Sequence, residues 1–126
     1  MQHPDLTAAV EEGLRSVPML DVHTHLDASH LSARGLHDVL LYHMLISELG
    51  SAGCPTLTRL AENPDDAEAH TRIVEALPYL RSIRNTGLYW VLSTILRDLF
   101  GWTEPITRDN WRRLDGIVRE RAADPA

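Results

Sequence analysis

The chain has 126 residues, enough for one domain with a hydrophobic core, whereas a whole (β/α)8 barrel typically needs about 250. Its net charge of −6 argues against nucleic acid as the main partner, because Lys and Arg are not in excess to neutralise phosphates. The sequence contains neither an apolar stretch long enough for a membrane span nor a signal peptide. Cys54 is the only cysteine, which excludes an internal disulfide and favours a cytoplasmic setting.

The N-terminal segment is predicted to form a helix followed by a short strand. Asp5 can cap the helix, and Pro18 ends it. Residues 19–23 then form a short apolar run that is typical of a buried strand. The apolar positions at helical spacing are Leu6, Val10, Leu14 and Val17.

The middle of the chain predicts further helices. Residues 36–49 are apolar nearly all round, so we expect one helix there, inside a larger protein. A break at 50–55 and a short helix at 56–62 follow. His37 is expected to be a loop or cap residue, and His70 to be a solvated helix residue. Pro78 interrupts the next helical stripe, which predicts a kink or two pieces. That stripe is Ala69, Ile73, Leu77 and Leu80.

Two amphipathic helices are expected in the last third. Thr86 can cap the first, which runs to Phe100 and ends at Gly101. Thr107 is expected to cap the second, and its Arg112, Arg113, Arg119 and Arg121 to form a solvated face. The residues expected inward on the first helix are Leu88, Val91, Leu92, Ile95, Leu96 and Leu99. The stripe of the second helix is Trp111, Leu114, Val118 and Arg121.

The pattern His23-Thr24-His25 predicts half of a divalent-metal site. Residues i and i+2 of a strand project from one face, so both imidazoles would point the same way. Imidazole nitrogens are common ligands of zinc and similar ions. Asp21 could orient one of the two imidazoles by accepting a hydrogen bond from its second ring nitrogen, as carboxylates near metal-binding histidines often do. The alternative is that both histidines are surface residues or are satisfied by structural hydrogen bonds.

Two blocks of sequence resemble a known family. Residues 21–26 (Asp-Val-His-Thr-His-Leu) resemble the strand-1 metal motif of the amidohydrolase superfamily, whose members are (β/α)8 barrels. Residues 78–90, with Phe-Gly at 100–101, are similar to a segment of uronate (glucuronate) isomerases that contains Tyr-His-Trp, although here Tyr89-Trp90 lacks the His. The resemblance runs from about residue 17 to about residue 121 and matches only the N-terminal part of the family's length.

The resemblance also implies roles for individual residues. His23 and His25 match the two strand-1 metal ligands, and the Asp that would complete the site is not in the chain. His43 is similar in position to the His of a substrate-binding His-Tyr pair, although here Tyr42 precedes it and Met44 follows. By residue type, His43 is a candidate catalytic base, with Tyr42 beside it as a substrate contact. A hydrogen-bonded core histidine is the competing interpretation of His43.

The resulting expectation is a mostly α chain with one short strand, the N-terminal piece of a metal-dependent (β/α)8 barrel. Residues 1–30 would supply the first helix and strand 1, and residues 31–126 a helical insertion, with the remaining barrel absent. The implied activity is interconversion of an aldo-uronate such as glucuronate and its keto form. The alternatives are a metal-dependent hydrolase and a non-catalytic helical binding or assembly module. We expect a small sugar acid as the ligand, no nucleic acid or membrane partner and a potential for homo-oligomers. The chain alone is expected to be inactive.

Overall fold

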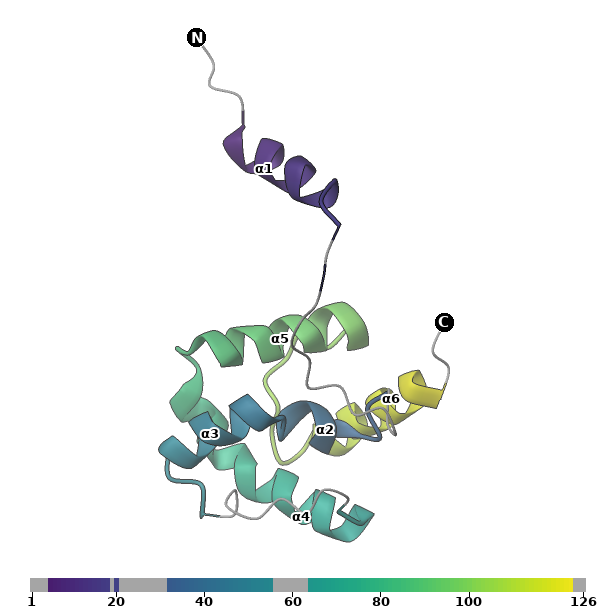
Figure 1. Ribbon diagram of the computed structural model, residues 1–126. Helices are drawn as coiled ribbons and strands as arrows, with labels where there is room; N and C mark the ends of the chain where they lie inside the picture. Colours follow the sequence, from purple (N-terminus) through teal and green to yellow (C-terminus); the bar gives the residue numbers. More distant parts are fainter. Residues whose placement is uncertain (1–4, 19, 21–31, 56–63, 124–126) are drawn as a thin grey trace.

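The structure is a computed structural model that describes residues 5–18, 20, 32–55 and 64–123. Figure 1 shows the helices that these residues form. They are α1 (Leu6–Arg15), α2 (Leu36–Leu40), α3 (His43–Ser51), α4 (Asp66–Ala76), the 3₁₀ helix η2 (Leu77–Ile83), α5 (Gly87–Phe100) and α6 (Trp111–Ala123). None of these helices is long and apolar enough to cross a membrane.

The described part of the chain is all-helical, which corrects the expected fold class of a strand plus insertion from a (β/α)8 barrel. Residues 5–18, 20, 32–55 and 64–123 contain no strand. Of the expected strand at 19–23, only Leu20 is described, and it is not in a strand. The physical reason is that the apolar faces of the helices bury one another, so this part of the chain forms a core without a sheet.

The bundle has two connected halves. Helix α2 packs against α4 and α6, while α3 packs against α5 and η2. Contacts between α4 and η2, and between α5 and α6, join the halves. The core between the helices includes Leu36, Leu40, Leu45, Leu49, Ile73, Leu77, Leu80, Ile83, Leu92, Leu96, Trp111, Leu114 and Val118.

The expected single helix over residues 36–49 is two helices, and this prediction was wrong. Helix α2 ends at Leu40, and extended backbone at Tyr42 (φ −61°, ψ 141°) interrupts the helix before α3 begins at His43. The two short helices have different neighbours, because α2 packs against α4 and α6 and α3 packs against α5 and η2. Leu36 in α2 and Leu49 in α3 are both fully buried. Residues 36–49 look apolar all round because their apolar residues belong to two separate helices, each with its own buried face.

Local signals place most helix ends as predicted. The Asp5 side chain accepts hydrogen bonds from the N–H groups of Thr7 and Ala8 at the start of α1. Thr86 Oγ1 accepts from the Tyr89 N–H at 3.2 Å. Gly101 ends α5 in the left-handed region (φ 64°), a conformation that suits glycine.

The regions around Pro78 and α6 follow the prediction in part. Helix α4 ends at Ala76, and the chain continues as the 3₁₀ helix with Pro78 in its first turn, so the predicted interruption is confirmed. Helix α6 begins at Trp111, and Thr107 accepts from the Asp109 N–H just before it. Three of its four stripe residues are buried. Arg121, the fourth, is exposed instead, and its Nε donates to the Leu99 carbonyl at 3.4 Å.

Two helices expose apolar side chains, and on α5 the burial is less than predicted. On α5, Leu92 and Leu96 are buried, but Val91 is 41% exposed and Leu99 is 56% exposed. Helix α1 lies apart from the other helices and buries none of its residues (Figure 1). Its apolar side chains Leu6 and Leu14 are 75% and 67% exposed. Within the described structure, the face of α5 is only partly covered and that of α1 is exposed.

Candidate functional site

The predicted metal ligands cannot be placed. His23 and His25 lie outside the described residues, as do Asp21 and Asp27. Their metal-binding role therefore stays a prediction. Among residues 5–18, 20, 32–55 and 64–123, no group of three His, Cys, Asp or Glu side chains is arranged to hold a metal ion.

The predicted substrate contacts lie at the start of α3. Tyr42 is the N-cap residue of this helix, and its side chain is partly exposed. His43 is the first helical residue, and its side chain lies outside the described part of the chain. Catalysis by His43 and substrate contact by Tyr42 and His43 therefore stay predictions.

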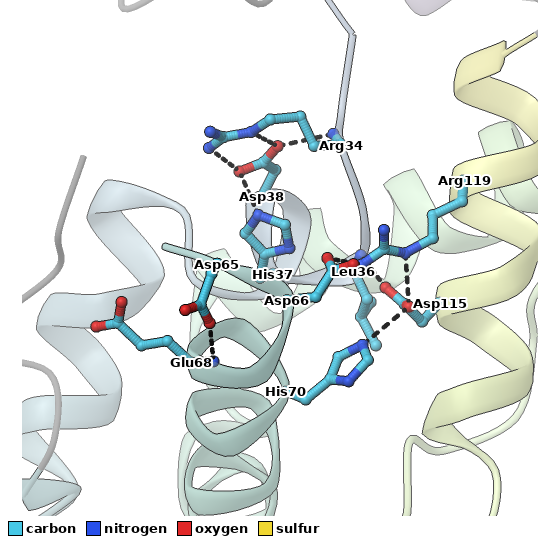
Figure 2. Close-up of polar contacts among 10 residues, drawn as sticks. All are labelled: Arg34, Leu36, His37, Asp38, Asp65, Asp66, Glu68, His70, Asp115 and Arg119. Carbon is cyan, nitrogen blue, oxygen red and sulfur yellow. Dashed lines mark hydrogen bonds and ion pairs between the residues drawn. The ribbon is translucent and has the colours of Figure 1, made fainter. Parts of the chain in front are cut away.

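A cluster of charged side chains, here called the polar junction, joins α2, α4 and α6 (Figure 2). Its members are Arg34, His37, Asp38, Asp66, His70, Asp115 and Arg119. Asp115 is buried at its centre, and its Oδ1 accepts a 2.8 Å hydrogen bond from the N–H of Leu36. Its Oδ2 accepts from Arg119 Nε at 2.8 Å, and Arg119 also donates to Asp66 Oδ1 at 2.8 Å. One carboxylate on α6 thus holds the beginning of α2 and, through Arg119, the beginning of α4.

The close approach of Asp115 explains the glycine before α2. A Cβ atom added at Gly35 would lie 2.8 Å from Asp115 Oδ1, too near for an unstrained contact. Gly35 supplies no side chain to cap the helix. The N–H of Leu36, one of the donors that a helix start leaves unpaired, is satisfied by Asp115 instead.

Arg34 and Asp38 form the outer part of the junction. The Arg34 guanidinium donates to both Asp38 oxygens at 2.9 and 2.8 Å, and the Arg34 N–H adds a third bond at 2.8 Å. Burial by itself would raise the pKa of Asp38, but the hydrogen bonds from Arg34 outweigh it and lower that pKa. Asp38 is thereby held as a carboxylate.

His37 is a buried residue of α2, so the expectation of a loop or cap residue was wrong. Its side chain is 8% exposed. Its Nε2 atom lies 3.2 Å from Asp38 Oδ1, and neither ring nitrogen forms a well-aligned hydrogen bond in the described structure. Burial lowers the pKa of His37, although the nearby Asp38 carboxylate opposes this shift. The neutral imidazole is therefore the favoured form at this position.

His70 also belongs to the junction, whereas the sequence predicted a solvated residue. Its Nε2 lies 3.5 Å from Asp115 Oδ2, and its ring meets the Trp111 ring edge to face at 5.1 Å between centroids. Burial alone would raise the pKa of Asp115, but the Leu36 N–H and Arg119 outweigh it and lower that pKa. Asp115 is therefore an ionised anchor for its neighbours.

The junction's chemistry is structural. The carboxylates of Asp38, Asp66 and Asp115 already accept hydrogen bonds from Arg side chains or from backbone N–H groups. Sequence reasoning missed the junction because Leu36 and Asp115 are 79 positions apart. One local signal was available: residue 35 is a glycine where a helix starts, so the donors at that helix end needed a partner from elsewhere.

The described structure also has an open, largely apolar groove between α3 and the corner where η2 meets α5. Among its lining residues, the Glu48 carboxylate contacts the hydroxyl of Thr86, which also lies 2.9 Å from the Ile83 carbonyl. Met44, at one edge, is half exposed. The lining residues are Met44, Ser47, Glu48, Ser51, Ala52, Ser82, Ile83, Thr86 and Leu88. The groove can accept an apolar group, and it holds no pair of groups poised for acid–base chemistry.

Comparison with known proteins leaves the family open. No family model, no curated protein and no solved structure matches this chain.

Proposed function

We propose that this chain is part of a metal-dependent enzyme similar to uronate isomerases, which interconverts an aldo-uronate such as glucuronate and its keto form. The observation that carries the proposal is the pattern His23-Thr24-His25 after Asp21, together with the isomerase-like block at 78–101. The two imidazoles would hold a divalent ion, zinc or similar, which polarises a carbonyl or hydroxyl oxygen of the sugar. His43 would be the base that moves the proton, with Tyr42 beside it contacting the sugar.

Two features of the bundle support this assignment of roles. The isomerase-like block forms one continuous structural unit, from the 3₁₀ helix through α5 to Gly101. The charged side chains of the polar junction are occupied by one another and by the start of α2. The chemistry is therefore assigned to the segment around His23 and His25 and to the start of α3 at Tyr42 and His43, and the rest of the bundle to their support.

The test is binding of the sugar acid to the zinc-loaded chain. In ligand-observed NMR, we expect glucuronate to show saturation transfer that is lost when zinc is removed and weakened by His43→Ala or Tyr42→Phe. Glucose, which lacks the carboxylate, is the matched control ligand. Equal transfer for glucose and glucuronate, or transfer that is independent of zinc, would contradict the proposal.

A metal-dependent hydrolase is the alternative within the same superfamily, because one scaffold supports different reactions. The same experiment with a panel of esters and amides separates the two. Zinc-dependent binding or turnover of a panel member, with none of glucuronate, would favour the hydrolase.

A second candidate function is a non-catalytic assembly module, and a specific observation favours it. The apolar groove and the exposed faces of α1 and α5 are surfaces that a partner could cover. A chain that binds neither zinc nor glucuronate but self-associates would support this candidate.

A further inference from the structure

Helices α1 and α5 each carry an apolar stripe that nothing in the described structure covers fully. On α1, Val10 is 52% exposed, and no residue of the helix is buried. On α5, Val91 and Leu99 are exposed, while Leu88 and Ile95 are half-buried. The matching stripes are Leu6, Val10 and Leu14 on α1 and Val91, Ile95 and Leu99 on α5.

The two stripes match in length and spacing. Each spans eight steps along its helix, or about 12 Å at the rise of an α-helix. Read forward, the steps on α1 are four and four residues, and read backward from Leu99, the steps on α5 are the same. An antiparallel arrangement therefore sets Leu6 against Leu99 and Leu14 against Val91. It also brings the two helix dipoles into a favourable opposite orientation.

The net negative charge of α1 favours a protein partner over an anionic membrane. The helix and its cap carry Asp5, Glu11 and Glu12 against Arg15, so an anionic membrane would repel it. The antiparallel arrangement places Asp5 near the end of α5 at Leu99, where Arg121 is exposed and donates to the Leu99 carbonyl.

We propose that α1 of one copy of this chain lies antiparallel on α5 of a second copy, with Leu6 against Leu99 and Leu14 against Val91. Helix α1 lies apart from its own bundle (Figure 1), so its stripe remains available to another copy. Because each copy carries both surfaces, the exchange is reciprocal and buries the same interface twice around a two-fold axis. This dimer does not depend on the proposed enzymatic function.

Light scattering coupled to size-exclusion chromatography tests the dimer. We expect a concentration-dependent shift from the mass of one chain to twice that mass. Leu14→Asp should return the protein to the mass of one chain without unfolding the bundle, because Leu14 has no buried contact with it. Ala8→Asp, on the opposite side of α1, is the matched control and should still dimerise. A monomer at all concentrations, or a dimer that persists in Leu14→Asp, would overturn the proposal.

Cross-linking of two differently tagged chains tests the partner and the register. When the Leu14→Cys chain is mixed with the Val91→Cys chain and oxidised, we expect a disulfide-linked species that carries both tags. Leu6→Cys mixed with Val91→Cys should give at least tenfold less, since these positions are at different levels of the interface. Equal cross-linking of both pairs, or no cross-link, contradicts the proposal. Binding of a monomeric chain to phosphatidylserine vesicles through α1 would replace it with a membrane role.

Discussion

The carboxylate of Asp115 on α6 accepts a 2.8 Å hydrogen bond from the backbone N–H of Leu36, the first residue of α2 and 79 positions earlier in the chain. This single contact links the beginning of the bundle to its end. Figure 2 shows that Arg119 and His70 converge on the same carboxylate. One buried carboxylate therefore links α2, α4 and α6 in addition to their apolar core contacts.

Replacement of Asp115 by Ala should destabilise the bundle strongly. The change leaves the Leu36 N–H and the Arg119 guanidinium without their buried acceptor, which costs about 3 kcal/mol of unfolding free energy. Urea unfolding followed by circular dichroism measures this. Asp109→Ala is the control, because Asp109 is exposed and should change stability by less than about 0.5 kcal/mol. Equal stability of the two variants would show that the contact is unimportant.

Replacement of Gly35 by Ala should also destabilise the bundle. The new Cβ would lie 2.8 Å from Asp115 Oδ1 and 3.2 Å from Arg119 Nε, so the junction must shift, at a cost of about 1–3 kcal/mol. Gly116→Ala on α6 is the matched control. It is exposed, has open space for a Cβ and should gain up to about 1 kcal/mol from better helix propensity. A Gly35→Ala protein as stable as Gly116→Ala would refute the steric argument.

Stability should fall as the pH is lowered from 7.5 to 5.5, because of His37. Burial lowers the pKa of His37 below its usual value of 6.5, so the unfolded chain takes up a proton at this residue more readily than the folded chain. The stabilisation of the folded state by the neutral His37 is therefore fully present above pH 6.5, and it is lost as the pH falls toward the lowered pKa. Urea midpoints at the two pH values should differ in the wild type and converge in His37→Gln. A midpoint that rises on acidification would have the wrong sign.

Further loss of stability should occur at lower pH. The pKa values of Asp38 and Asp115 lie below the usual 3.8, because Arg34 outweighs the effect of burial at Asp38, and the Leu36 N–H and Arg119 outweigh it at Asp115. Their stabilisation is present above that value and is lost as the pH falls through the lowered pKa values. Acid titration of Asp115→Asn should lack the Asp115 part of this loss. An unchanged acid transition would contradict this assignment.

Helix boundaries in this chain could be predicted because their causes are local. Asp5, Thr86 and Gly101 act within a few residues of themselves, and Pro78 disrupts the α-helix at its own position. The division of residues 36–49 into two helices could not be predicted, since both pieces are apolar and only packing decides where the chain turns.

The candidate sites show the same contrast. A histidine pair two residues apart can be recognised from sequence, but the environments of His37 and His70 depend on α6 and could not. The burial of α5 was overpredicted for a related reason. Its apolar stripe is continuous in sequence, yet the bundle covers only the side that carries Leu92 and Leu96.

Zinc titration of the purified chain tests the central claim most directly. A competing chromogenic chelator should report zinc binding by the wild type that is weakened at least tenfold in His23→Ala and in His25→Ala. His30→Ala, a histidine of the same segment outside the motif, should bind zinc as the wild type does. If the His23 and His25 variants bind zinc as tightly as the wild type, or if the wild type binds none, the metal-dependent enzyme proposed here is wrong.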